Sequence, residues 1–430
     1  MLSVEKNQML TQVSAGTPMG DYLRRYWHPI AGASEFDNKS IKPVRILGEN
    51  LTLYKDLSGN YGLVDRHCSH RRADLSFGFV EQTGIRCNYH GWRFDANGVC
   101  IEQPYDDVVR PANAQRPARC NIKAYPVKEC AGLLFAYMGP MPAPELPVFE
   151  PFTWQNGFRE VVISDVPCNW FQCQENSCDP IHFEWMHDNW SIRLKGKEGP
   201  YAAKHQIVKF EEFDHGFVYK RIREGGSEKD PYWTTGRVAL WPNAFYLGGH
   251  FEFRVPIDDE NTLSVAWFFM RVPKGREPFV QKSVPTWYSP MSDANGNVIT
   301  SHVMNQDFVA WVGQGRIADR TKENLAASDA GIVMIRKRFF DDIEAMQRGE
   351  DVKGTVRDPA KAACVELPYF QKQIMREGLA LEDYKKYPLM EQRLYGFVHM
   401  AGQPREIREA HVDAFGLRGT PYAADVEEKK

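Results

Sequence analysis

The sequence predicts an α+β protein in which a small all-β domain precedes a larger domain whose helices cover an antiparallel sheet. Between residues 41 and 150, short apolar and β-branched runs alternate with turns rich in Gly and Asn, which is typical of a small antiparallel domain. From residue 151 to 430, helical, strand-like and again helical segments follow one another. The 430 residues are enough for both parts to bury a core.

Residues 1–40 are expected to form a helical or turn-rich segment that packs on the larger domain. The all-β domain, residues 41–150, should contain strands at 44–47, 51–54, 61–65 and 132–138, with a hairpin turn at 95–98. Four prolines between residues 140 and 147 indicate a linker, so this domain should end near residue 150.

The larger domain, residues 151–430, should begin with a strand at 161–163 and a helical region at 170–190 that carries histidines. Its sheet is expected from the strand-like runs 217–221, 237–241 and 263–267. Helices return after residue 305, and 329–348 places apolar residues at roughly helical spacing: Ile332, Ile335, Phe339 and Ile343.

Composition excludes several classes of partner. The net charge is -3 and there is no long basic run, so nucleic acid and anionic membranes are poor candidates. No stretch of about 18 apolar residues is present, and the N-terminus has no targeting pattern, so we expect a cytoplasmic protein. The nine cysteines are an odd number in a long chain, which argues against a disulfide framework.

Two pairs of Cys and His form the most specific motif. Cys68 and His70 are separated by sixteen residues from Cys87 and His90. One thiolate and one imidazole from each of two loops suit a Rieske [2Fe-2S] centre, in which both thiolates bind one iron and both imidazoles bind the other. A zinc site with the same four ligands is the alternative, although structural zinc more often uses Cys-x-x-Cys or His-x-x-x-His spacing.

A second group of candidate ligands lies in the larger domain. His182 and His187 are five residues apart, a spacing that a widened π-type turn would bring onto one face. Two imidazoles and one distant carboxylate form the facial triad of non-haem Fe(II) oxygenases. The best carboxylate is Asp307, at the start of an expected helix, whereas Asp319 and Asp329 look like capping or ion-pair residues. Alone, such a histidine pair is often incidental.

With both motifs present, the chain resembles the Rieske non-haem iron oxygenases. The resemblance implies a helix-grip type of catalytic domain, iron ligation by His182 and His187, and a bridging role for Asp179, three residues before His182. That aspartate would pass an electron from a Rieske histidine of a neighbouring subunit. It is also a good helix N-cap followed by Pro180. Asn176 stands one position away from where one branch of the family has an Asn, so its role stays open.

The segments around residues 16–27 and 306–321 look like the phthalate-dioxygenase branch. A substrate of that branch would carry a carboxylate, which guanidinium groups bind well. The candidates for contact with it, none of them distinguished by sequence alone, are Arg221, Arg223, Arg237, Arg254 and His250.

The expected reaction is cis-dihydroxylation of an aromatic carboxylate with O2, and the alternative is monooxygenation such as O-demethylation. No dinucleotide fingerprint is present, so a separate NAD(P)H-dependent reductase should supply the electrons. Transfer between subunits requires an oligomer, which the resemblance implies is a homotrimer or homohexamer. Two rivals of other classes are a Rieske electron carrier with a binding domain, and a zinc-stabilised interaction protein.

Overall fold

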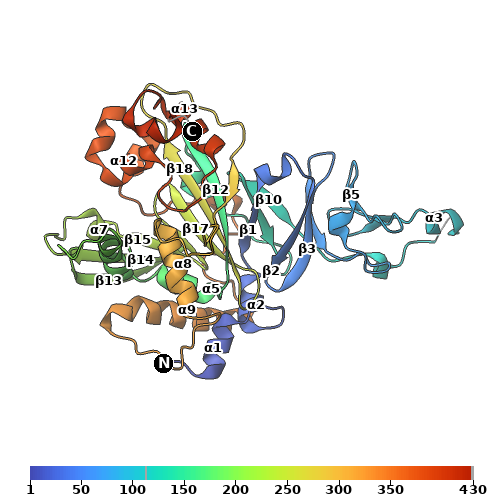
Figure 1. Ribbon diagram of the computed structural model, residues 1–430. Helices are drawn as coiled ribbons and strands as arrows, with labels where there is room; N and C mark the ends of the chain where they lie inside the picture. The colour runs from blue at the N-terminus through green and yellow to red at the C-terminus, as the bar shows by residue number, and fades with distance from the viewer. Residues whose placement is uncertain (112–113, 428–430) are drawn as a thin grey trace.

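The chain folds into a broad domain from which an arm projects to one side (Figure 1). This is a computed structural model that describes residues 1–111 and 114–427. The arm is the all-β domain, and its outer end carries β5 (Phe79–Val80) and the short helix α3 (Asp106–Val109). Among the described residues, no helix has the length and apolar character needed to cross a membrane.

Three small antiparallel sheets build the arm and its base. The expected hairpins are confirmed: β2 (Ile41–Ile46) pairs with β3 (Glu49–Lys55), and β3 with β4 (Tyr61–Asp65). The sheet of the arm's outer part has the order β5-β6-β7-β8, and the other strands are β6 (Ile85–Arg86), β7 (Arg93–Phe94), β8 (Cys100–Glu102), β9 (Ala124–Tyr125), β10 (Val127–Cys130) and β11 (Leu133–Tyr137).

The N-terminal segment differs in part from the expectation. Helices α1 (Val4–Thr11) and α2 (Pro18–Leu23) form, and they contact α5 (Trp170–Asn176) and α9 (Ala330–Gln347) of the larger domain. The prediction of helix or turns is wrong over Trp27–Gly32, which is strand β1, paired with β11. All six residues of β1 are buried, so a pairing with residues about a hundred positions away decides its structure rather than local propensity.

An eight-stranded sheet forms the centre of the larger domain, in the order β13-β14-β15-β16-β17-β18-β12-β19. It is antiparallel as expected, except that the short edge strand β19 runs parallel to β12. The expected strands are all present, and the bounds are β12 (Gly157–Val166), β13 (His205–Phe213), β14 (Gly216–Arg223), β15 (Arg237–Leu240), β16 (Ala244–Tyr246), β17 (His250–Pro256), β18 (Thr262–Arg271) and β19 (Thr286–Tyr288).

Helices lie over this sheet (Figure 1). The region expected to be helical at 170–190 consists of α5 (Trp170–Asn176) and a π-helix, η4 (Phe183–Asn189), which runs into α6 (Trp190–Leu194). The predicted helix at 329–348 is α9 (Ala330–Gln347), whose Phe339 stacks on Trp241 of the sheet domain. The remaining long helices are α8 (Val303–Gly313), α12 (Pro388–Tyr395) and α13 (Arg405–Phe415), with the short α4 (Glu150–Thr153), α7 (Pro231–Thr234), α10 (Pro359–Ala362), α11 (Lys372–Glu377) and α14 (Ala424–Glu427).

Candidate metal centres and cavity

The four residues of the Cys and His motif meet near the outer sheet of the arm. Cys68 and Cys87 are buried in one small apolar cluster, whereas His70 and His90 are exposed, with ring centroids 4.6 Å apart. The His70 ring stacks on Trp92 at 4.7 Å. Gly91 follows His90 with φ +75°, a left-handed turn that a side chain would strain. The motif therefore places thiols inside and imidazoles at the surface.

Burial favours the neutral forms of both the thiol and the imidazole at this site. Burial raises the pKa of the Cys68 thiol to about 12, so a bound metal would be needed to hold it as a thiolate. Burial and the neighbouring His90 lower the pKa of His70, which favours the neutral imidazole that binds a metal.

The spread of the four ligands distinguishes a cluster from a single ion. Among the described residues, only His182, His187 and Asp307 form a group of three or more Cys, His, Asp or Glu side chains whose ligand atoms all lie within 4.8 Å of one another. Ligands on one zinc ion at bond lengths of about 2.0–2.3 Å would lie roughly 3–4 Å apart. The motif on the arm is wider than that, which fits two irons better than one zinc.

The spacing of His182 and His187 is explained by the π-helix η4, as the sequence predicts. His182 precedes its first residue and His187 lies within it, so the widened turn brings both imidazoles to one side. Their ring centroids are 5.2 Å apart.

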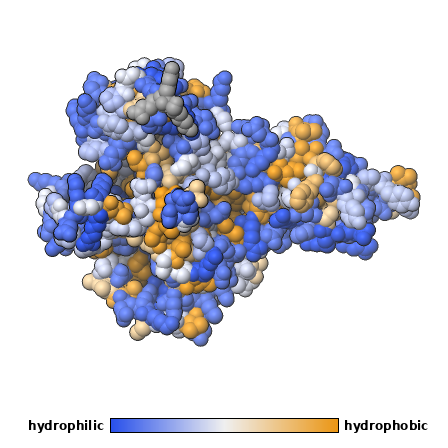
Figure 2. All heavy atoms as spheres, in the orientation of Figure 1, coloured by the Kyte–Doolittle hydropathy of each residue, from blue (hydrophilic) through white to orange (hydrophobic). Residues whose placement is uncertain are grey.

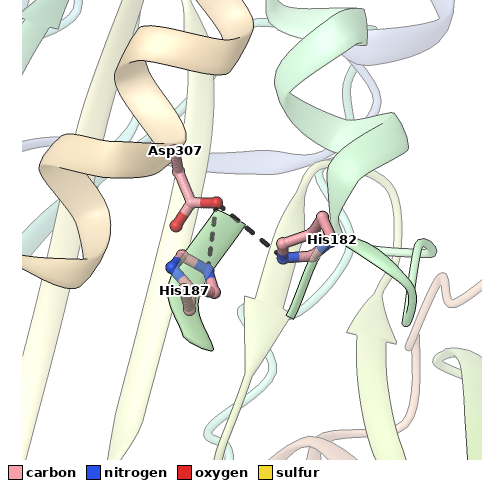
Figure 3. A group of neighbouring side chains, drawn as sticks. All are labelled: His182, His187 and Asp307. Carbon is pink, nitrogen blue, oxygen red and sulfur yellow. Dashed lines mark ion pairs between the residues drawn. The ribbon is translucent and has the colours of Figure 1, made fainter. Parts of the chain in front are cut away.

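Asp307 completes the group, from the second turn of α8 rather than from its start (Figure 3). Its Oδ1 lies 3.4 Å from His187 Nε2 and 3.8 Å from His182 Nε2. Two ligand atoms that each lie about 2.1 Å from a metal ion, at right angles to one another, are roughly 3 Å apart. Asp307 Oδ1 would need to move only slightly closer to the two imidazole nitrogens for the three side chains to bind one ion. The competing carboxylates have other partners: exposed Asp319 pairs with Lys322, and Asp329 accepts from the backbone of Ala326.

Neighbouring amides orient this triad. Gln306 Nε2 donates to Thr300 O and Ser191 Oγ, so its Oε1 accepts from His187 Nδ1 at 3.0 Å. That bond leaves the lone pair of His187 on Nε2, facing Asp307. Burial alone would lower the pKa of His187, but the charge of Asp307 and then the hydrogen bond to Gln306 raise it overall. The surroundings of His187 therefore stabilise a positive charge at this position. Asn176, whose role the sequence left open, donates to Asp307 Oδ1 at 3.2 Å.

Asp179 lies beside the triad and reaches the surface. Its Oδ2 is 3.6 Å from His182 Nδ1, and its side chain is 31% exposed. Its Oδ1 accepts from the backbone N of Ile181, as the capping interpretation predicts. Burial would raise the pKa of Asp179, but the nearby His182 lowers it overall, so it stays a carboxylate. One oxygen caps the turn while the other faces a candidate ligand.

A cavity opens directly against the triad, and its wall includes His182, His187 and Asp307. Of the five substrate candidates, only His250 lines it. The wall residues Glu252 and His399 could not be predicted from the sequence, because neither has a spacing that links it to the ligands. His399 joins His250 only through tertiary packing, with ring centroids 4.8 Å apart.

The four arginine candidates lie outside the cavity wall, and Arg223 forms an ion pair with Asp188 at 2.7 Å. Arg254 is bound to Glu252, with Nη2 2.6 Å from its Oε2. Arg221 and Arg237 lie against Phe183, a wall residue, with guanidinium carbons 4.8 and 4.3 Å from its ring centre. Both are buried, and neither forms an ion pair with a carboxylate of the described residues. Burial and then Arg237 lower the pKa of Arg221 to about 10.

Comparisons with known proteins agree with both sites. The family model described as the Rieske [2Fe-2S] domain matches residues 26–125, and the model described as LigXa C-terminal domain like matches residues 290–389. The chain is 57% identical over 417 residues to the 5,5'-dehydrodivanillate O-demethylase oxygenase subunit of Sphingobium sp., covering 97% of this chain and 98% of that protein. It is 31% identical to the phthalate 4,5-dioxygenase oxygenase subunit of Pseudomonas putida, covering 83% and 89% of the two chains.

Solved structures share the fold. Pseudomonas putida CBB5 NdmA has a TM-score of 0.55 at 20% identity and covers 76% of this chain and 92% of its own. The terminal oxygenase of carbazole 1,9a-dioxygenase from Novosphingobium sp. KA1 has a TM-score of 0.51 at 22% identity, with coverages of 78% and 97%. With the match to the sequence relatives over nearly its whole length, the chain belongs to the Rieske non-haem iron oxygenases, as an oxygenase subunit with a [2Fe-2S] cluster and a mononuclear iron.

Proposed function

We propose that this chain is the oxygenase component of an aromatic acid O-demethylase. The observation that carries the proposal is 57% identity, over 97% of the chain, to a protein named as a dehydrodivanillate O-demethylase oxygenase subunit. This choice reverses the order of our sequence-based hypotheses, which put cis-dihydroxylation first and O-demethylation second.

The roles of the metal-binding residues follow from the two sites. Cys68, Cys87, His70 and His90 hold the cluster, and the triad holds the mononuclear iron. When bound, this iron supplies O2 activation with electrons from the cluster. The triad offers only three ligands, which leaves coordination positions for O2 next to the cavity.

The overall reaction is balanced by two electrons and two protons. An aryl methyl ether, O2, two electrons and two protons give a phenol, formaldehyde and water. A C–H bond of the methoxyl methyl is oxidised, its C–O bond to the ring oxygen breaks, and the ring oxygen takes up a proton. The cavity wall must therefore hold the methoxyl beside the triad and keep bulk water out, and its apolar residues Phe183, Phe245 and Val303 serve that purpose.

Electrons are supplied from outside the chain. A separate NAD(P)H-dependent reductase reduces the cluster, and Asp179 receives the electron from a histidine of a neighbouring subunit in a homotrimer or homohexamer. The exposed imidazoles of the arm and the partly exposed carboxylate of Asp179 support this route, because both ends of the transfer reach the surface.

The positions of Arg221 and Arg237 support the proposal that the substrate carries a carboxylate. Two buried guanidinium groups without a carboxylate partner among the described residues are costly, and an anion beside them would offset that cost. Because both lie against Phe183, a rotation of that ring would connect them to the cavity.

Product analysis tests the proposal. The purified protein, a surrogate reductase, NADH and O2 are incubated with dehydrodivanillate, with 4-hydroxy-3-methoxybenzoate and with phthalate. We expect one formaldehyde for each new phenol from a methoxylated acid. A cis-diol from phthalate without formaldehyde from any methoxylated acid would contradict O-demethylation and favour the second candidate, dihydroxylation, to which the phthalate 4,5-dioxygenase relative points.

A further inference from the structure

A buried carboxylate attaches the π-helix η4 to the edge of the large sheet. Glu184 lies between the candidate iron ligands His182 and His187 and is 5% exposed. Its Oε2 accepts hydrogen bonds from the backbone N of His205 at 2.8 Å and from His205 Nδ1 at 2.9 Å. His205 is the first residue of the edge strand β13, and its side chain is also buried. Two hydrogen bonds therefore join η4 to the start of this strand.

The partners of both ring nitrogens fix the position of the hydrogen on His205. Arg221 Nη1 and Arg223 Nε each lie 3.4 Å from His205 Nε2, and a guanidinium group can only donate. Nε2 therefore accepts, and the hydrogen of the ring is on Nδ1, which donates to Glu184. The imidazole cannot turn over without losing hydrogen bonds at both ends.

The carboxylate of Glu184 supports η4 and does not belong to the triad itself. Among the described residues, the group of ligand atoms within 4.8 Å of one another contains only His182, His187 and Asp307. Glu184 follows His182 by two positions, but its carboxylate is bound to His205 instead. Its contribution to the metal centre must therefore come through the shape of η4.

A widened turn needs such support. In a regular α-helix, His182 and His187 would point about 140° apart and could not bind one ion. Turns of the π type are rare and mostly occur singly, so the backbone alone does not favour them. Here the supporting strand β13 is fixed by its pairing with β14, and a second contact joins η4 to β14, where Asp188 pairs with Arg223 at 2.7 Å. These contacts hold the wide turn against rewinding into an α-helix.

We propose that Glu184 and His205 are positioning residues of the mononuclear iron site, whose hydrogen bonds keep η4 in the conformation that brings His182 and His187 to one ion. The inference rests on the proposed iron-binding role of the triad. Loss of the contact should weaken iron binding there and leave the cluster intact, because the candidate cluster ligands lie on the arm.

Anaerobic competition with a ferrous chelator tests this without substrate or turnover. The holoenzyme, with its cluster oxidised, is titrated with the chelator, and the released Fe(II) gives the Kd of the mononuclear site while the absorption of the cluster is followed. We expect this Kd to rise about tenfold in Glu184→Ala and in His205→Leu, the lower end for residues outside the ligand shell, since neither touches a ligand. His205→Asn keeps an N–H donor near the position of Nδ1 and should recover most of the affinity.

Two controls separate positioning from a general loss of stability. Glu211→Gln removes an ion pair between the same two strands, farther along β13. His28→Gln alters a fully buried histidine on β1. Both variants should leave the Kd of the mononuclear iron unchanged. Asp307→Ala, which removes a candidate ligand, should abolish binding at this site.

An unchanged Kd in Glu184→Ala and His205→Leu, an equal rise in His28→Gln, or no recovery in His205→Asn would overturn the inference and leave the triad as the iron site. If Asp307→Ala also binds iron as tightly as the wild type, the triad is not the iron site, and the inference fails with it. The absence of formaldehyde from wild-type reactions would refute O-demethylation alone.

Discussion

At the scale of single residues, Asp307 is the ligand whose loss should be most specific. It is the only carboxylate of the triad, and α8 holds it without help from the metal. We expect Asp307→Ala to lower the iron content from about three to about two atoms per chain, because the cluster on the arm is separate. Iron quantification and the electron paramagnetic resonance spectrum of the cluster measure this. Asp319→Ala, an exposed carboxylate, is the control. Three irons in Asp307→Ala would show that another residue is the ligand.

The carboxylate of Asp179 should matter for electron transfer and not for metal binding. Asp179→Asn keeps an oxygen that can cap the backbone N of Ile181 but removes the charge beside His182. We expect both metal centres to remain while product formation falls by about 100-fold, the scale at which misplacing one functional group acts. Oxidation of the reduced cluster by O2, followed in a rapid-mixing experiment, should slow equally. If this variant retains full turnover, Asp179 is only a cap.

At the scale of elements, a buried ion cluster holds α5 to its neighbours. Glu175, at the end of α5, pairs with Arg320 and with Arg336 of α9, each at 2.6 Å. We expect Glu175→Ala to lower the free energy of unfolding by about 3–5 kcal/mol, because buried Arg320 loses its carboxylate partner and Arg336 keeps only Glu323. Glu211→Ala, on a half-exposed pair, should cost about 0–1 kcal/mol. Equal losses in urea denaturation would mean that the cluster is not a structural anchor.

A second element-scale prediction concerns His28 on β1. Its Nε2 donates to Leu23 O and its Nδ1 faces the amide of Asn243, and burial lowers its pKa to about 4. In the unfolded state the His28 imidazole has a pKa near 6.5, so between pH 6.5 and pH 4 it binds a proton there but not in the folded state. The contribution of His28 to stability is therefore full above pH 6.5 and is lost as the pH falls toward 4. Between pH 7 and pH 5 the loss from His28 should be about 2 kcal/mol.

The variant His28→Gln isolates that contribution. We expect it to be less stable than the wild type at pH 7 but to lose about 2 kcal/mol less between pH 7 and pH 5, since the other titrating groups are common to both proteins. Unfolding free energies at the two pH values give the double difference. An identical pH dependence in both proteins would place the proton uptake elsewhere.

Elements whose evidence is local were predictable, and those fixed by distant partners were not. The Cys and His pairs and the His182–His187 spacing lie within short segments, so their chemistry and even the π-helix follow from the sequence. Strand β1 forms because it pairs with β11, and one part of the cavity wall forms because His399 packs against His250. Neither contact can be predicted from a local sequence pattern. The arginines were chosen for charge alone, and the structure places them behind Phe183 or against Glu252.

At the scale of the whole molecule, the arm separates the two metal sites of one chain. Figure 1 shows the outer sheet of the arm well away from α8, which carries Asp307. Figure 2 shows apolar side chains on the arm, where the exposed large apolar residues include Phe77, Phe79, Tyr89, Tyr105 and Val108. Exposed apolar side chains on the arm, among them Tyr89 against His90, suit contact with another protein. This separation is consistent with the proposed transfer of electrons from the arm to the triad of a neighbouring subunit.

Mixed oligomers give a direct test of that arrangement. One chain carries Asp307→Ala and keeps its cluster, and the other carries Cys68→Ser and keeps its triad, so each alone should be inactive. If electrons cross between subunits, co-expression in equal amounts should restore about one quarter of wild-type activity, because one interface in four pairs an intact cluster with an intact triad in the right direction. Iron analysis of Cys68→Ser alone, with about one iron per chain, confirms its triad. If electrons stay within one chain, no mixture can be active, and the roles proposed for the exposed histidines and for Asp179 between subunits fail together.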